Sequence, residues 1–140
     1  MHAKIFYDIN KFDTYSNILK KSHIRTTDFE DALKYSVKND LIFADPPYVS
    51  NSKNVGFSNY NDKIFTWQDQ LRLHKSLVDA RERGSIIVLT NVNCKEIIDL
   101  YKESEFYVAK IQRNSTISGS SKGRKNITEL MISSFEIDPT

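Results

Sequence analysis

Two short apolar runs with an amphipathic stretch between them constrain the fold of this chain more than any other feature. The first run is Leu41-Ile42-Phe43-Ala44, which Asp45-Pro46-Pro47 halts, and the second is residues 85–90. Such runs are typical of central strands that are buried on both faces of a parallel sheet. The segment between them begins with a capping box at Thr66-Trp67-Gln68-Asp69 and carries a broad apolar helical face up to Arg83. Strand, helix and strand in this order predict a crossover unit and an α/β fold.

Further elements are expected after the second run. Gly84 is placed to end the crossover helix, and Asn93-Cys94-Lys95-Glu96 has the pattern that opens another helix, through about Tyr101. Residues 106–111 and 129–135 have the pattern of strands. The Ser/Gly/Lys/Arg-rich segment 112–128 predicts a long loop between them.

Upstream of the first run the signals are shorter. Thr27-Asp28-Phe29-Glu30 matches a capping box and predicts a short helix through about Val37. We expect residues 23–26 to form a short strand before it.

Composition narrows the class of protein. One hundred and forty residues with 39% hydrophobic and 27% charged residues are typical of one globular domain. Because no segment has the roughly 18–20 apolar residues of a membrane span, and charges interrupt the amino terminus, we expect neither membrane insertion nor export. The single cysteine, Cys94, fits a reducing cytoplasm, and we expect it to be a small buried residue. The spacing of His2, His23 and His74 predicts no metal site.

Asp45-Pro46-Pro47-Tyr48 is the motif with the clearest chemistry. Two consecutive prolines fix two backbone φ angles and remove two amide hydrogens, so the turn is rigid. The Asp45 carboxylate and a nearby prolyl carbonyl form a pair of acceptors that suits an exocyclic amino group, and Tyr48 offers a ring on which a base can stack. Ligands of open α/β sheets bind at the carboxyl ends of the strands, where this motif lies. The alternative is a strand-ending turn in which Asp45 caps and Tyr48 packs.

Positive charge is concentrated in one segment although the formal net charge is only +2. Residues 106–128 contain no Asp or Glu and five basic residues: Lys110, Arg113, Lys122, Arg124 and Lys125. A loop of one sign that is rich in Ser and Gly suits contacts with phosphates. The alternative is a solvated lysine-rich loop.

Together these motifs resemble the Dam-type adenine-specific DNA methyltransferases, the family in which Asp-Pro-Pro-Tyr is the amino-methylation motif. The resemblance covers about residues 24–137. It includes an aromatic loop, a helix, a Gly and an apolar strand that ends in Ser/Thr-Asn. It also includes an Arg-Ser-Ile-Ser-like segment, an Arg before a Glu-led final strand, and an upstream Asp-Phe pair. The matching residues are Phe57, Tyr60 and Phe65, residues 67–83, Gly84, Thr90-Asn91, residues 113–118, Arg124, Glu129 and Asp28-Phe29.

The resemblance implies methyl transfer from S-adenosylmethionine to the N6 amino group of an adenine flipped out of double-stranded DNA, as in restriction-modification systems. Asp45 and the carbonyl of Pro46 would accept hydrogen bonds from the amino group, and Pro47 would keep the turn rigid. Tyr48 would stack on the base, with Phe57 or Phe65 as a second wall. Asp28, Phe29 and Asp45 would bind the cofactor. The residues expected to contact DNA are Tyr60, Arg113, Ser115, Lys122, Arg124 and Lys125.

The resemblance also implies that the cofactor half of the fold is not represented. The family has a Gly-rich turn after its first strand, whereas the glycines here, at positions 56, 84, 119 and 123, all follow Asp45. We therefore expect residues 23–140 to form the carboxyl-terminal half of a Rossmann-like methyltransferase sheet with a terminal β-hairpin. Residues 1–22 would be a remnant of the target-recognition region. The missing first strands would cover the edge next to Leu41–Ala44. Because the Gly-rich turn is missing, we expect no activity without a complementing amino-terminal fragment or subunit.

Two other functions are compatible with the same residues. The chain could be a remnant that binds DNA without catalysis. It could instead methylate amino groups of another substrate, such as cytosine, RNA or a protein glutamine. Relatives that act on cytosine and glutamine more often have Ser or Asn at the position of Asp45, so this residue favours adenine.

Overall fold

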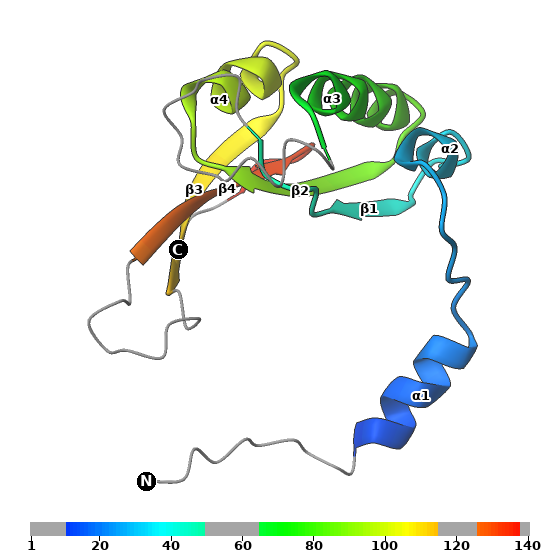
Figure 1. Cartoon of the computed structure of the whole chain (residues 1–140). Helices are drawn as coiled ribbons and strands as arrows, with labels where there is room; N and C mark the ends of the chain where they lie inside the picture. The colour runs from blue at the N-terminus through cyan, green and yellow to red at the C-terminus, as the bar shows by residue number, and fades with distance from the viewer. Residues whose placement is uncertain (1–10, 50–64, 115–125, 138–140) are drawn as a thin grey trace, which may run out of the picture.

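The computed structural model describes residues 11–49, 65–114 and 126–137 (Figure 1). Within these ranges the chain forms helices and strands that alternate from α2 to β3. They are α1 (Phe12–Lys20), α2 (Phe29–Leu33), β1 (Leu41–Ala44), α3 (Trp67–Glu82), β2 (Ile86–Val92), α4 (Lys95–Lys102), β3 (Tyr107–Asn114) and β4 (Asn126–Ser133).

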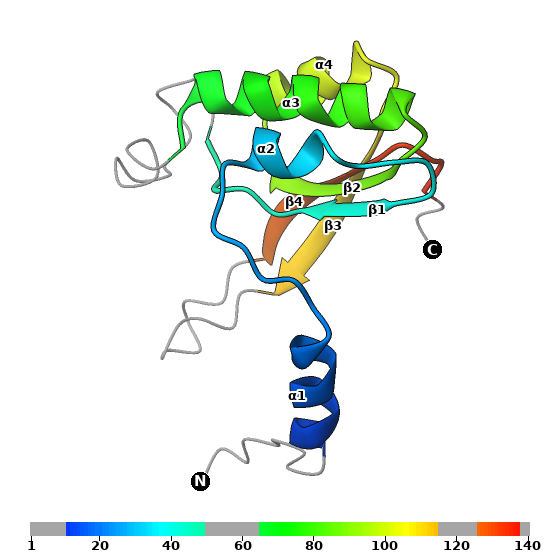
Figure 2. The ribbon, with the colours of Figure 1, turned by 90° about the vertical axis from the view of Figure 1, so that its right-hand side faces the viewer.

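The four strands form one sheet in the order β1-β2-β4-β3. β1 and β2 are parallel, whereas β4 is antiparallel to both β2 and β3. Helices α2, α3 and α4 cover one face of this sheet, and α1 lies apart from it on the other side (Figures 1 and 2). The predicted α/β fold, the crossover unit and the terminal antiparallel pair are confirmed.

The β1 strand differs from the prediction in one respect. Among the described strands β1 lies at an edge of the sheet, which agrees with the expectation that the strands beside it are missing. The expected burial on both faces is not found, since Leu41 and Phe43 are each 66% exposed. Ile42 and Ala44, on the alternate face, pack against the core. An apolar run allows both faces of a strand to be buried. Whether a face is buried depends on the helices and strands that pack on it, and the run itself does not encode these.

The crossover helix α3 forms as predicted. The Thr66 side chain accepts a hydrogen bond from the backbone N–H of Asp69 at 3.2 Å, and the Asp69 carboxylate accepts one from the backbone N–H of Thr66 at 2.9 Å. This reciprocal capping box starts the helix. Gly84 follows the other end with φ of +93°, a conformation that glycine adopts without strain. Between the ends, Leu73, Leu77 and Ala80 pack into the core.

The upstream boundaries differ from the prediction. The N-cap of α2 is Asp28 rather than Thr27, and its side chain accepts from the backbone N–H of Glu30 at 2.9 Å. The helix ends at Leu33 rather than Val37, because the Arg83 side chain donates to the carbonyl oxygens of Leu33 and Ser36 and so satisfies acceptors at its end. Residues 23–26 form no strand.

The downstream boundaries also shift. The N-cap of α4 is Cys94 with no side-chain cap hydrogen bond, so the capping role expected of the Asn93 segment is not found. The predicted loop 112–128 is shorter, because β3 continues to Asn114 and β4 begins at Asn126, and these two residues pair. Backbone pairing needs no apolar side chains, so a polar composition did not mark the strand ends.

A buried polar network joins the sheet to two helices. The Asn91 amide on β2 donates to the Gln70 side-chain oxygen on α3, and the Gln70 amide donates to the Tyr101 hydroxyl on α4, both at 3.0 Å. The Asn91 oxygen accepts from the backbone N–H of Val92 at 2.8 Å. All three side chains are fully buried. Because each buried polar group has a partner, the network fixes how α3 and α4 sit on β2.

The network generates a stability prediction. Gln70→Ala removes the partner of both Asn91 and Tyr101 and leaves a cavity. We expect a loss of about 2–4 kcal/mol in the free energy of unfolding, because a buried amide is left unsatisfied and the packing around it is reduced. Gln68→Ala, an exposed position on the same helix, is the control and should change it by less than about 0.5 kcal/mol. Urea denaturation compares the two, and equal losses would show that the network contributes nothing.

Candidate active site at the end of strand β1

The Asp-Pro-Pro-Tyr motif directly follows β1, at the carboxyl end of two parallel strands. Asp45 is exposed, whereas Tyr48 is partly buried against the core and Val49 is 2% exposed. The motif is therefore anchored at its far end by Val49 and at its near end by β1. The packing of Tyr48 supports part of the alternative interpretation, in which this ring is a structural contact.

A pocket of about 360 Å³ lies beside the motif, between β1 and the helices α2 and α3. Its walls are almost entirely apolar. The residues that line it are Phe29, Ala32, Leu33, Ile42, Phe43, Ala44, Asp45, Pro46, Pro47, Phe65 and Leu73. The rings of Phe29 and Phe65 lie with centroids 6.1 Å apart and planes inclined by 57°. The volume is in the range of sites for small organic ligands, and the lining suits a flat apolar group.

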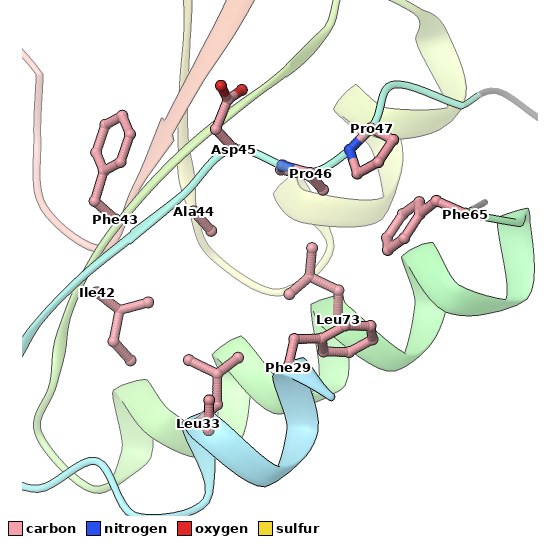
Figure 3. A pocket seen from close by; sticks show the side chains of 11 residues that line it. Phe29, Leu33, Ile42, Phe43, Ala44, Asp45, Pro46, Pro47, Phe65 and Leu73 are labelled. Carbon is pink, nitrogen blue, oxygen red and sulfur yellow. The ribbon is translucent and has the colours of Figure 1, made fainter. Parts of the chain in front are cut away.

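Phe43 and Asp45 are among the residues that line the pocket, but their side chains point away from the apolar wall that the helices provide. Figure 3 shows the side chains of Phe43 and Asp45 pointing away from Ile42, Leu33 and Phe29. This follows from the alternation of side chains along a strand, since residues 43 and 45 share one face. The turn thus separates an apolar pocket on the helix side from an exposed carboxylate on the uncovered side.

Asp45 has a partner on the neighbouring strand. The hydroxyl of Thr90 on β2 donates to Asp45 Oδ1 at 2.5 Å. The parallel register pairs Ala44 with Leu89, so residues 45 and 90, the next positions after this pair, lie side by side. Sequence patterns did not identify Thr90 as a contact of Asp45, because strand register is not visible in them.

A charge cluster holds α2 against α3 next to the pocket. Arg72 of α3 donates to Glu30 at 2.6 Å and to Asp28 at 3.1 Å, both at the start of α2, and to Asp69 at 2.8 Å. Its guanidinium also lies 4.9 Å from the centroid of the Phe29 ring. One side chain therefore fixes the residue before Phe29, the residue after it and the ring itself.

The cluster shifts the pKa of its members. Hydrogen bonds from the Glu30 backbone and from Arg72 lower the pKa of Asp28, and bonds from Thr66 and then Arg72 lower that of Asp69. The carboxylates, Glu30 first, raise the pKa of Arg72. No sequence signal singled out Arg72, since it is one of several charged residues on an amphipathic helix.

The predicted Asp28-Phe29 pair is divided in the structure. Phe29 lines the pocket, whereas Asp28 is occupied as a helix cap and as a partner of Arg72 and is not part of the lining. The role of Asp28 in cofactor binding stays a prediction. Phe65 is 6% exposed and belongs to both the core and the pocket wall, and its role as a second wall for the flipped base stays a prediction.

Most residues predicted to contact DNA lie outside the described residues. These are Tyr60, Ser115, Lys122, Arg124 and Lys125, together with Phe57 of the aromatic loop. Arg113 lies near the end of β3. The structure shows where this segment is attached. β4 extends past the end of β2, because Val92 pairs with Glu129 and three further residues of β4 precede Glu129. The β3–β4 tip thus lies at the same end of the sheet as Asp45.

Other candidate groups have structural partners. Cys94 is buried, as predicted, and burial raises the pKa of its thiol. His74 contacts the Ser104 hydroxyl at 2.9 Å and the edge of Tyr101, and burial lowers its pKa. In the described ranges no group of three or more His, Cys, Asp or Glu side chains could hold a metal ion. None of the helices there is long and apolar enough for a membrane span.

Comparison with known families shows a clear match. The profile described as "D12 class N6 adenine-specific DNA methyltransferase" matches residues 2–117. A Type II methyltransferase of Lactococcus lactis subsp. cremoris, M1.LlaDCHI, is 28% identical over 130 residues, which cover 91% of this chain and 45% of that protein. The DNA N-6-adenine-methyltransferase of Escherichia phage P1 is 28% identical over 120 residues, 84% of this chain and 16% of that protein.

A third relative is the Type II methyltransferase M.MjaIII of Methanocaldococcus jannaschii, 29% identical over 135 residues that cover 96% of this chain and 46% of that protein. The chain thus spans less than half the length of each of these relatives. A solved chain from Pyrococcus horikoshii aligns with 72% of this chain and 44% of its own length, at a TM-score of 0.36 and 12% identity, too distant to support an inference.

The charge cluster generates a prediction with a pH dependence. The lowered pKa values mean that Asp28 and Asp69 stabilise the fold above their ordinary pKa of 3.8, and that this contribution is lost as the pH falls through the lower pKa of the folded state. We expect Arg72→Ala to lower the urea midpoint at pH 7, and the difference from wild type to shrink well below pH 3.8.

Lys75→Ala is the matched control, since Lys75 is an exposed cation on the same helix that pairs with Asp79 alone among the described carboxylates. It should change the midpoint little at either pH, as is usual for an exposed pair. Equal midpoints for the Arg72 and Lys75 variants at pH 7 would show that the cluster does not hold α2.

Proposed function

Because the chain belongs to the D12 class N6 adenine-specific DNA methyltransferase family, we propose that it forms the part of such an enzyme that orients the exocyclic amino group of adenine for methylation. The observation that carries the proposal is the placement of Asp45. Its carboxylate stands exposed at the carboxyl end of β1, next to a rigid Pro46-Pro47 turn and with an apolar pocket on the other side of that turn.

The pocket suits the adenine ring of S-adenosylmethionine. Its lining is apolar, and two phenylalanine rings, Phe29 and Phe65, stand on its wall. A purine ring buries well against such surfaces. When bound, the cofactor supplies a methyl group on a positively charged sulfur. Asp28 caps α2 beside Phe29 and accepts from Arg72, and we expect a remaining lone pair of this carboxylate to accept a hydrogen bond from the cofactor.

Asp45 and the Pro46 carbonyl would act on the target amino group. The Asp45 oxygen that Thr90 does not contact and the Pro46 carbonyl can each take one hydrogen of the amino group, which turns the nitrogen lone pair toward the methyl group. Neither proline offers an amide hydrogen that would compete. Catalysis would then depend on orientation and on acceptors that are already in place. Tyr48 is only partly buried against the core, and the exposed part of its ring would stack on the flipped base.

DNA would approach the sheet at the end where Asp45 lies. The paired ends of β3 and β4 extend past the end of β2 on this side. They belong to residues 106–128, the segment without Asp or Glu that contains Arg113, Ser115, Lys122, Arg124 and Lys125. Cations at this position can hold phosphates next to the site where a flipped base would enter. Tyr60, in the loop that follows the motif, would contact the DNA or close over the base.

Two exposed apolar surfaces support the proposal that an amino-terminal part complements this chain. Leu41 and Phe43 of β1 are each 66% exposed, and β1 pairs with β2 alone among the described strands. Helix α1, which lies in the proposed target-recognition remnant (residues 1–22), has no buried residue, and its apolar side chains Phe12, Ile18 and Leu19 are each more than half exposed. An amino-terminal part that pairs a strand with the edge of β1 and packs a helix on its exposed face would cover these side chains, and it would bring the Gly-rich turn that binds the rest of the cofactor.

The decisive experiment is a methylation assay with the complementing part supplied. This chain is mixed with an amino-terminal half from the Lactococcus relative, with adenine-unmethylated phage DNA and labelled S-adenosylmethionine, and methylated bases are identified by mass spectrometry. We expect N6-methyladenine from the mixture and none from this chain alone. Asp45→Ala should lower the rate by about 100- to 1,000-fold or more, the usual effect of removing one preorganised electrostatic group.

Asp79→Ala is the matched control, since it removes a carboxylate of α3 that pairs with Lys75. It should leave the rate within about twofold of wild type. Full activity of the Asp45→Ala mixture would refute the proposal. Methylated cytosine instead of adenine would show another substrate, and activity of this chain alone would remove the need for a complementing part.

Variants of the basic residues test DNA binding separately from catalysis. If the chain is a DNA-binding remnant without catalysis, its affinity for DNA survives Asp45→Ala and nothing is methylated. In either case we expect the triple variant Lys122→Ala/Arg124→Ala/Lys125→Ala to weaken DNA binding and to reduce the slope of log affinity against log salt by about 3, because three phosphates are no longer neutralised. Fluorescence anisotropy with labelled duplex DNA at several salt concentrations measures this slope.

A charge-matched triple variant on the helix layer, Lys34→Ala/Lys75→Ala/Lys95→Ala, serves as the control. These lysines are exposed on α2, α3 and α4 or at their ends, and each pairs with an aspartate of the same helix. Their removal should leave the slope unchanged. A reduced slope in this variant alone would place the DNA on the helix face.

A further inference from the structure

The hydrogen bond between Thr90 and Asp45 joins two strands at the exposed carboxylate. Thr90 Oγ1 donates to Asp45 Oδ1 at 2.5 Å, across 45 positions of sequence. Among the described residues, Thr90 is the one that donates a hydrogen bond to the Asp45 side chain, and it contacts Oδ1 only. No donor in the described ranges contacts the other oxygen, Oδ2, which can therefore accept a hydrogen bond from a ligand.

Thr90 is well suited to act as a fixed donor. It lies in β2 between β1 and β4, directly opposite Met131. The next residue, Asn91, is fully buried and bonded to Gln70 of α3. The branched side chain of threonine also has few rotamers in a strand. The position of the hydroxyl is therefore set by the sheet and the buried network, whereas Asp45 lies on an exposed turn.

This arrangement determines the direction in which the carboxylate presents its acceptor. An aspartate side chain on an exposed turn samples several staggered rotamers. Thr90 has a single hydroxyl hydrogen, and by giving it to Oδ1 it selects the rotamer in which Oδ1 faces β2. A bound amino group then meets Oδ2 in a defined direction, which is what catalysis by orientation requires.

We propose that Thr90 is a positioning residue for the methyl-transfer reaction, which holds the Asp45 carboxylate so that Oδ2 accepts the hydrogen bond from the target amino group. The inference rests on the proposed function, because it assigns to Thr90 the task of orienting the group that acts on the substrate. It assigns no substrate contact to Thr90 itself.

The kinetic test uses the reconstituted methylation assay. Thr90→Val keeps the shape and the branching of the side chain but removes the hydroxyl. We expect kcat to fall about 10- to 100-fold, the scale of a misplaced catalytic group. The KM values for DNA and for S-adenosylmethionine should stay within about threefold of wild type, because binding surfaces are not altered. Thr90→Ser restores the hydroxyl and should recover most of kcat.

Met131→Leu is the matched control, a volume-conserving change at the residue opposite Thr90 on the same face. It should leave kcat unchanged. If Thr90→Ser is as slow as Thr90→Val, or if Met131→Leu is equally slow, the effect comes from strand packing and the inference is wrong.

A second measurement needs no activity. Three-bond NMR couplings across the Cα–Cβ bond of Asp45, recorded on this chain alone, should report one rotamer in wild type and in Thr90→Ser. In Thr90→Val they should report an average over staggered rotamers. Averaged couplings in wild type, or one rotamer in Thr90→Val, would overturn the inference.

The outcomes distinguish this inference from the proposed function. If Asp45→Ala abolishes methylation and Thr90→Val leaves kcat and the Asp45 couplings unchanged, the function stands and the role of Thr90 is refuted. If Asp45→Ala leaves methylation unchanged, or the wild-type mixture methylates nothing, the proposed function is refuted and the role of Thr90 falls with it, even where the couplings show a held rotamer.

Discussion

The parallel pairing of β1 with β2 is the constraint on which the rest of the structure depends. Parallel strands cannot be joined by a tight turn, so a helix must cross between them, and α3 does so. The register Ala44↔Leu89 then brings Asp45 beside Thr90. The same crossover places α3 next to α2, and the pocket forms between these helices and β1.

Two further interactions stabilise this pairing from the helix side. The fully buried Gln70, Asn91 and Tyr101 tie β2 to α3 and α4, so the end of β2 has little freedom to shift. Arg72 ties the first turn of α2 to α3 and sets the Phe29 ring at the pocket wall. One set of contacts therefore supports the carboxylate side of the motif, and the other supports the apolar side.

The alternation of side chains along β1 gives the site its two-sided form. Ile42 and Ala44 face the helices, while Phe43 and Asp45 face the uncovered side (Figure 3). A reaction that joins two ligands, a methyl donor and an adenine, needs two adjoining places with different chemistry. In the proposed function, the rigid turn with an apolar pocket on one side and a carboxylate on the other would provide these two places.

Local signals in the sequence determined the elements of this protein and its family. The apolar runs, the Thr66 capping box and Gly84 depend on neighbours a few residues away, so β1, α3 and β2 could be predicted, as could the motif at Asp45. The ends of α2 and of the β3–β4 loop could not, because Arg83 and strand pairing decide them from a distance. Only the tertiary structure decided that one face of β1 is exposed, that Thr90 contacts Asp45 and that Arg72 holds α2 against α3. These depend on register and on helix packing, which join residues some 40 or more positions apart and leave no periodic pattern in the chain.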